Sequence, residues 1–222
     1  MGLKLSTNHG KWPEEDYRKA TQILVEASVE IALFNSSGKL LLFGKNEPRA
    51  VHPSKYWIAG KRKMLGESDR QAACRIMLEK YGIVIEQEDV EKIRNVDCYD
   101  FVRIKKHPDG TVEILRHKES KIMKYHLSVE EYAQVRKTVK SGENGYNEIV
   151  EKIPGEMVFD ETLDPSLRCL GIDLSISQLK DILISRKKFS DREQREYADL
   201  LVQAHTLTGL GDERIFYTEE VA

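Results

Sequence analysis

The sequence predicts an α/β protein in which helices pack on a β-sheet. Short runs rich in β-branched and aromatic residues, which are typical of strands, recur between residues 27 and 127. One segment of helical composition, residues 68–81, lies among these runs. From about Asp173 the sequence becomes charged and helix-forming, which predicts a helical extension at the C-terminus.

The first predicted elements are a helix and a β-hairpin. We expect residues 1–12 to be flexible. Pro13 suits the first turn of a helix that would run to about Val25, and the acidic residues after it complement the helix dipole. Residues 27–45 predict a hairpin, because two apolar runs flank the polar turn at residues 35–38.

Residues 57–83 predict a strand, a loop and a helix in succession. The strand is the aromatic and β-branched segment at the start. The loop, between Gly60 and Gly66, carries three consecutive basic residues. Ser68 suits the N-cap of the following helix, and Gly82 lies where a helix commonly ends.

The spacing of residues on this helix predicts two faces. Ile76, Glu79 and Lys80 lie at i, i+3 and i+4, so we expect them to share one face. The other side is expected to pack through four residues: Cys74, Met77, Leu78 and Tyr81.

Further strands and one helix are predicted downstream. Asp97–Lys106 and Thr111–His117 would be two strands joined by a turn that contains Asp-Gly, a strong hairpin signal. Ser120–Leu127 alternates as another strand would. Val129–Val139 favours a helix, and Asn147–Val158 is expected to cover the far end of the sheet.

Two C-terminal helices are predicted, Ser175–Arg186 and Ser190–Thr206, the second opened by a capping-box pattern. Such a pair could pack on the domain or form a dimer interface. A DNA-binding helix-turn-helix is disfavoured because the second helix is acidic. We therefore divide the chain into a flexible N-terminus (1–12), a main domain (13–172) and a C-terminal helical extension (173–222).

Composition limits the class of protein and its partners. Of the 222 residues, 40% are apolar and 32% are charged, which is typical of a globular protein. The formal net charge of −2 argues against a general nucleic-acid binder. No run of about 18 apolar residues predicts a membrane span, and no secretory signal is expected. Three widely spaced cysteines without a CxxC pair predict reduced thiols in a cytoplasmic protein.

The stretch that ends at Ile83 resembles the Nudix hydrolase box. That motif is Gly, five residues, Glu, seven residues, then Arg-Glu-U-x-Glu-Glu-x-Gly-U, where U is aliphatic. Here Glu67 is followed by seven residues and Arg75, and Glu79 takes the first of the paired Glu positions. Three further positions match: Met77, Gly82 and Ile83. The resemblance implies a Nudix-like α/β/α sandwich with a mixed β-sheet.

Three positions depart from the motif. Lys61 stands in the opening Gly position, Ile76 in place of the Glu after Arg, and Lys80 in place of the second paired Glu. The family holds Mg²⁺ or Mn²⁺ with carboxylates on one helix face. We therefore expect a metal site, formed by Glu79 and Glu67, that is weakened or absent. Glutamates at positions 76 and 80 would then raise the affinity for Mg²⁺, and Lys80 could act as a fixed cation beside a phosphate.

The resemblance also implies catalytic roles. The candidate catalytic residues are Glu67, Arg75 and Glu79. Glu79 would be a metal ligand, with an ordinary exposed helix carboxylate as the alternative. Glu67 and Arg75 would form a pair that stiffens the turn between loop and helix, with direct catalysis as the alternative.

The segment before the box looks most like the GDP-mannose mannosyl hydrolase branch of the family. In that branch an Arg just after the Gly pair helps hold the diphosphate, and Arg62 matches it. Five other residues are candidate substrate contacts: Gly60, Lys61, Lys80, Lys45 and Arg49. The alternative for Arg62, Lys45 and Arg49 is a solvated basic loop.

Nudix enzymes recruit a further carboxylate, or in the mannosyl branch a His base, from a distant loop. Glu143 and Glu148 are the candidate carboxylates. His52 lies near the expected cleft, whereas His117 and His126 lie on predicted strands, where a structural role is favoured.

Two functions follow from these residues. The first is a hydrolase of a nucleoside diphosphate linked to another group, such as a sugar, with an altered Mg²⁺ site. The second is a catalytically inactive Nudix-like domain that binds a nucleotide or a protein as a regulatory module. The expected partner is a nucleoside diphosphate derivative, and a homodimer is possible. Ile76 and Lys80 favour the second function. Four residues favour the first: Arg62, Glu67, Arg75 and Glu79.

Overall fold

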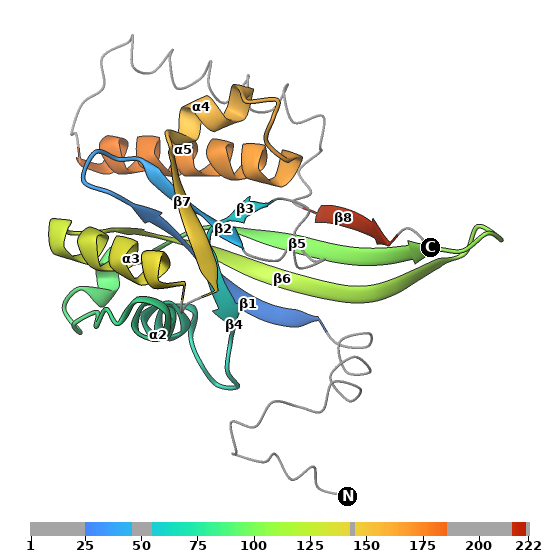
Figure 1. Cartoon of the computed structure of the whole chain (residues 1–222), viewed down its shortest axis with the longest axis horizontal. Helices are drawn as coiled ribbons and strands as arrows, with labels where there is room; N and C mark the ends of the chain where they lie inside the picture. The colour runs from blue at the N-terminus through green and yellow to red at the C-terminus, as the bar shows by residue number, and fades with distance from the viewer. Residues whose placement is uncertain (1–24, 46–54, 143–144, 186–214, 221–222) are drawn as a thin grey trace, which may run out of the picture.

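The computed structural model describes residues 25–45, 55–142, 145–185 and 215–220. In this part of the chain, eight strands form one mixed sheet that lies between helices (Figure 1). The strands are β1 (Glu26–Phe34), β2 (Leu40–Lys45), β3 (Tyr56–Trp57), β4 (Ala59–Arg62), β5 (Arg94–Lys106), β6 (Val112–His126), β7 (Tyr146–Lys152) and β8 (Ile215–Glu220). The helices are α2 (Asp69–Tyr81), α3 (Val129–Ser141), α4 (Pro154–Phe159) and α5 (Pro165–Ser185).

Strand β1 is central to this sheet. It runs parallel to β6, from Glu26 opposite Lys118 to Phe34 opposite His126. It also runs antiparallel to β4 and touches β2 at one position. Beyond these, β2 pairs with β3 and β7, and β5 lies between β6 and β8.

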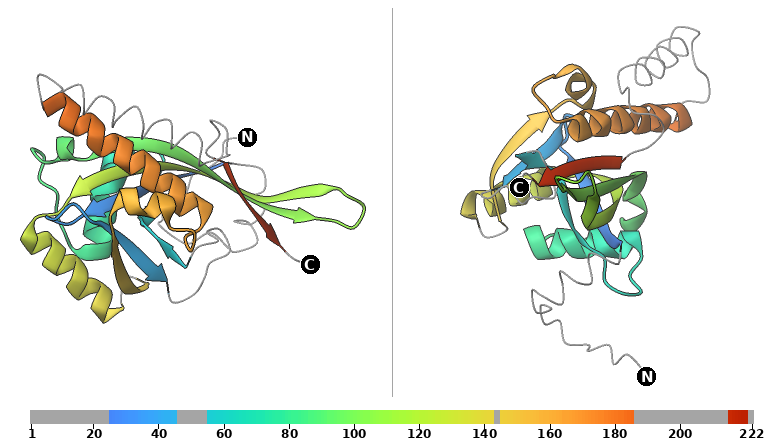
Figure 2. Two further views of the ribbon diagram at one scale, coloured as in Figure 1. Left: turned by 90° about the horizontal axis from the view of Figure 1, so that it is seen from above. Right: turned by 90° about the vertical axis from the view of Figure 1, so that its right-hand side faces the viewer.

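Helices cover both faces of the sheet (Figure 1 and Figure 2). On one face, α2 and α3 pack over Val29, Ile31 and Leu33 of β1. On the other face, α4 and α5 pack over Ala32 and Phe34 of the same strand. Alternate side chains of a strand point to opposite faces, so β1 contributes to both cores. The structure thus confirms the predicted α/β/α sandwich with a mixed sheet.

The predicted hairpin and the predicted helix at 68–81 are both present. Asn35 closes the hairpin turn, because its side-chain oxygen accepts hydrogen bonds from the amides of Ser37 and Lys39, each at 3.0 Å. Ser68 caps α2 and forms a capping box with Gln71. Gly82 ends the helix at a φ of 67°, in the left-handed region that favours glycine.

The predicted division of α2 into two faces is wrong. Ile76 is fully buried together with Met77 and Tyr81, whereas Leu78 is half exposed. The face of the helix that packs on the sheet consists of small and apolar side chains. Ile76 lies on this face, one turn after Ala72. A glutamate at position 76 would therefore place a carboxylate in the core.

Residues 111–117 and 120–127 were predicted as separate strands and instead belong to one strand, β6. It pairs with β5 over the whole length from Val112 to Lys124 and with β1 from Lys118 onward. The polar residues near 118–120 do not break the strand because Lys118 and Ser120 find polar partners on β1. The predicted Asp-Gly turn and the helix that begins at Val129 are confirmed.

At the C-terminal end, α5 begins at Pro165, ten residues before the predicted start. Asp164 accepts hydrogen bonds from the amide and hydroxyl of Ser166, which satisfies the first turn. The boundary predicted at residue 172 falls inside this helix, and the division into domains stays a prediction. Strand β8 was not predicted, and the helix predicted at 190–206 lies outside the described residues.

The flexible segment and the helix predicted at residues 1–25 also lie outside the described residues, apart from Val25. Among the helices that the structure does describe, none is both long enough and apolar enough to cross a membrane.

Candidate functional site

The connection from β4 to α2 begins as a strand. Residues 61 and 62 were predicted in a loop, but both belong to β4, with Lys61 opposite Val29 and Arg62 opposite Ser28 of β1. Paired residues of an antiparallel ladder point to the same face. Lys61 therefore lies on the α2 side of the sheet with Val29, and Arg62 lies on the opposite side with Ser28.

Gly60 has a packing role that its backbone position explains. A Cβ at this residue would lie 2.7 Å from Cγ of Glu30 and 3.0 Å from the carbonyl oxygen of Val29. Only glycine fits at these distances. The proposed contact of Gly60 with substrate stays a prediction.

Glu67 and Arg75 form a clamp at the start of α2. Arg75 donates to both carboxylate oxygens of Glu67, at 2.7 and 2.8 Å, and to the carbonyl oxygen of Arg62 at 2.8 Å. Glu67 also accepts the amide of Met64 at 2.8 Å. The hydrogen bond from Arg75 holds the pKa of Glu67 below its ordinary value, although burial opposes the shift. This geometry supports the predicted stiffening pair.

Glu79, the predicted metal ligand, is already bound to two cations. Its Oε2 atom lies 2.5 Å from Nζ of Lys61 and 3.4 Å from Nη1 of Arg75. Burial raises the pKa of Glu79, but the hydrogen bonds and charges of Lys61 and Arg75 outweigh burial and lower it overall. The carboxylate is therefore held in its charged form by the protein itself.

The other loop cations are paired too. Arg62 lies 3.0 Å from Glu26, and Lys63 lies 2.6 Å from Asp69. Each of the four cations Lys61, Arg62, Lys63 and Arg75 thus contacts a carboxylate, and Glu26 is shared with Arg116 at 2.6 Å.

Lys80 and Ile76 are separated from this cluster. Nζ of Lys80 lies 4.3 Å from the centre of the Tyr146 ring, a cation–π contact. The side chain of Ile76 is in the core. Ile76, Glu79 and Lys80 therefore do not form the predicted shared site. Ile76 lies in the core, Glu79 forms salt bridges, and Lys80 contacts an aromatic ring.

The motif residues that the structure describes do not fit a divalent metal ion. In the described segments, no group of three or more acidic, cysteine or histidine side chains could hold one. Of the two predicted ligands, Glu67 is engaged by Arg75 and Glu79 by Lys61. A hard divalent ion prefers several oxygen ligands, and here each carboxylate is matched by a cation.

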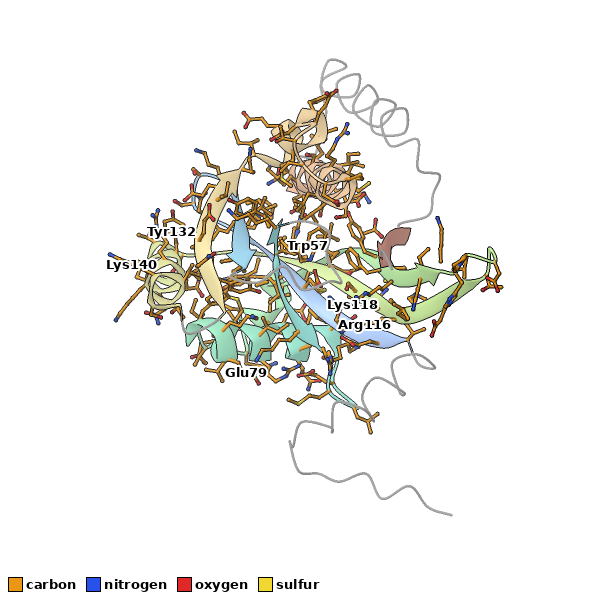
Figure 3. The ribbon with its side chains drawn as sticks, turned by 45° about the vertical axis from the view of Figure 1, so that its right-hand side comes forward. Trp57, Glu79, Arg116, Lys118, Tyr132 and Lys140 are labelled. Atoms are coloured by element: carbon orange, nitrogen blue, oxygen red, sulfur yellow. The ribbon has the colours of Figure 1, made fainter. Side chains whose placement is uncertain are left out.

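A second charged cluster lies on the opposite face of the sheet. Glu30 is 1% exposed and accepts hydrogen bonds from Lys118 and from the indole of Trp57. Lys118 and Arg116 project from β6, whereas Glu79 projects from α2 (Figure 3). Arg116 binds Glu26, which also contacts Arg62. One sign of this cluster is visible in the sequence, because Ser28 and Glu30 alternate with aliphatic residues in β1.

The remaining predicted site residues are dispersed. Glu148 lies on β7, bonded to Tyr56 at 2.6 Å and to Lys55 at 3.2 Å. His117 contacts Asp100 at 2.7 Å, and His126 stacks on Phe34, both in structural settings. Four predicted site residues have side chains that the structure does not describe: Lys45, Arg49, His52 and Glu143.

Comparisons with known proteins give similarity to solved structures alone. No protein-family model matches the chain, and no curated protein matches it. The MutT protein of Methanosarcina mazei Go1 shares 13% identity over 69% of this chain and 95% of its own, with a TM-score of 0.47. A mutT/nudix family protein from Listeria innocua shares 13% over 72% of this chain and 97% of its own, with a TM-score of 0.45.

A third similar structure is NrtR of Shewanella oneidensis complexed with a 27mer DNA. It shares 14% identity over 69% of this chain and 62% of its own, with a TM-score of 0.45. At these scores the likeness assigns neither a family nor an activity to the chain.

Proposed function

We propose that this chain is a Nudix-like domain without divalent-metal catalysis that acts as a binding module for a nucleoside diphosphate derivative. The observation that carries the proposal is the contact of Glu79 with both Lys61 and Arg75. A carboxylate that is neutralised in this way supplies little attraction for Mg²⁺. The ammonium of Lys61, whose side chain is 41% exposed, keeps further N–H donors that can bind the phosphates of a ligand.

The division of the cations between two faces limits how a ligand can bind. Lys61 and Arg75 lie on the α2 side, and Arg62 pairs with Glu26 on the other side. A single diphosphate that contacts Lys61 is therefore expected to involve Arg75 before Arg62. Nucleotide sugars belong in the ligand panel because of the resemblance to the mannosyl hydrolase branch. Homodimerisation stays a prediction.

The second candidate function is a hydrolase with a remodelled site. The specific observation in its favour is the intact clamp of Glu67, Arg75 and Met64, which keeps the turn before α2 rigid. Catalysis needs its groups held in a fixed geometry, which such a turn would provide. The hydrolase would require Lys61 to leave Glu79 when metal and substrate bind.

Thermal unfolding in the presence of ligands distinguishes the two functions. Nucleoside diphosphates and nucleotide sugars are each added with Mg²⁺ or with EDTA, and product release is followed in parallel. A ligand at 100 times its Kd stabilises the native state by about 2.7 kcal/mol. For a chain of this size that is roughly 5–10 °C in Tm.

The binding module predicts a rise in Tm that EDTA does not remove, without product. A rise that needs Mg²⁺, together with hydrolysis, would establish the second function instead. No rise with any of these ligands would contradict both.

A further inference from the structure

We propose that the ammonium group of Lys61 takes the place of a divalent cation at Glu79, and that it excludes metal and supplies the positive charge for a phosphate. The proposal rests on the binding function above for its ligand. The exclusion of metal does not depend on that function. It concerns which cation binds Glu79, the one carboxylate among motif positions 76, 79 and 80.

The position of Lys61 is fixed by backbone pairing. Its register opposite Val29 sends the side chain to the α2 face, where it meets Glu79 from a residue eighteen positions away in sequence. An ammonium has three N–H donors, and in the described part of the chain Glu79 is the one acceptor recorded for them. The side chain is 41% exposed, so a phosphate oxygen can reach the donors that point to solvent.

Lys80 does not fill this role. Although it is next to Glu79 in sequence, its ammonium is placed over Tyr146. Tyr146 is buried, and its ring also packs on Phe43 at 5.0 Å between ring centres. The cation that sits on Glu79 therefore comes from β4, at the position where the motif has its opening Gly.

A metal ion at Glu79 would encounter two positive groups. The ammonium of Lys61 is within hydrogen-bond distance of the same carboxylate oxygen, and the guanidinium of Arg75 is 3.4 Å away. Like charges at such separations repel strongly. Arg75 is further fixed by Glu67, so Lys61 is the group whose removal would open the site.

Binding of Mn²⁺, followed by paramagnetic resonance, tests the exclusion of metal. Lys61→Glu is compared with Lys63→Glu, which makes the same change of charge two residues away at a lysine paired with Asp69. We expect Lys61→Glu to bind Mn²⁺ at least tenfold more tightly than either Lys63→Glu or the unmodified protein. Equal affinities in the two variants would overturn the proposal, as would tight Mn²⁺ binding by the unmodified protein.

Calorimetry with ADP in EDTA tests the phosphate contact. Lys61→Ala should weaken ADP binding about tenfold or more, as expected for the loss of a charged hydrogen-bond donor. Lys63→Ala should leave the Kd within about twofold of the unmodified value. Equal effects of the two substitutions would overturn the contact with phosphate.

The outcomes separate the two proposals. If the unmodified protein does not bind ADP or any diphosphate of the panel, the binding function fails and the phosphate contact fails with it. The Mn²⁺ comparison then decides alone whether Lys61 replaces the metal. Circular dichroism of each variant verifies that it is folded, which is expected because both lysines are partly exposed.

Discussion

At the scale of single residues, Glu67 and Arg75 fix the turn that leads into α2. Their side chains are 11% and 17% exposed, so the pair is shielded from water. The pKa of Glu67 is lowered in the folded protein, and its charge therefore contributes stability above its unfolded pKa. That contribution is lost as the pH falls through the lower, folded value.

We predict that Glu67→Gln lowers the free energy of unfolding by about 2 kcal/mol at pH 7, because it removes the charge from the clamp. The deficit should shrink below about pH 4, where the unmodified protein also loses the charge. Urea unfolding at pH 7, 5, 4 and 3 measures both effects. Glu86→Gln, at an exposed carboxylate, should change little at any pH. A deficit that persists unchanged at pH 3 would contradict the role of the charge.

Contacts between residues near in sequence could be predicted from the sequence, whereas contacts between distant strands could not. The motif spacing pointed to the pairing of Glu67 and Arg75, which are eight residues apart and make their contact at the start of α2. It could not show that Lys61 reaches Glu79, because that contact depends on the register between β4 and β1. It could not show the burial of Glu30 either, since the partner Lys118 lies on a distant strand.

At the scale of elements, α4 and α5 approach each other at Gly171. A Cβ there would lie 2.7 Å from the carbonyl oxygen of Pro154 and 2.9 Å from Cβ of Met157. The helix predicted from Ser175 did not include this residue, and glycine inside a helix normally lowers its stability. Here the absence of a side chain is what allows the two helices to pack.

We predict that Gly171→Ala lowers the free energy of unfolding by about 1–3 kcal/mol, because the added methyl overpacks the contact between the helices. Gly155→Ala in α4 is the matched control, since the nearest atom to its Cβ is Ser175 Oγ at 3.9 Å. The control should be neutral or stabilising by up to about 1 kcal/mol. Thermal and urea unfolding of the two variants test this, and equal stabilities would show that α4 moves to accommodate the methyl.

At the scale of the whole molecule, the buried pair of Glu30 and Lys118 joins β1 to β6, and the indole of Trp57 adds β3. The strands are distant in sequence, so the pair forms only when the sheet is assembled. A buried charge that loses its partner costs far more than the intact pair contributes.

We predict that Lys118→Met lowers the free energy of unfolding by about 3–5 kcal/mol, because the buried carboxylate of Glu30 loses its ammonium partner. The double variant Glu30→Gln, Lys118→Met should recover part of that loss, since no isolated charge remains. A double-mutant cycle by urea unfolding provides the measurement. Additive losses in the two single variants would mean that the pair is not coupled.

The pairing of β8 with β5 bears on how the chain is made. The ribosome adds about 5–20 residues each second, so roughly 5–20 seconds separate the emergence of β5 from that of β8. During this interval the edge of β5 that faces β8 lacks its final partner. An open strand edge readily joins the edges of other chains. Slow translation between these strands would prolong that exposure. Chaperones that bind extended segments would act on β5 during this interval.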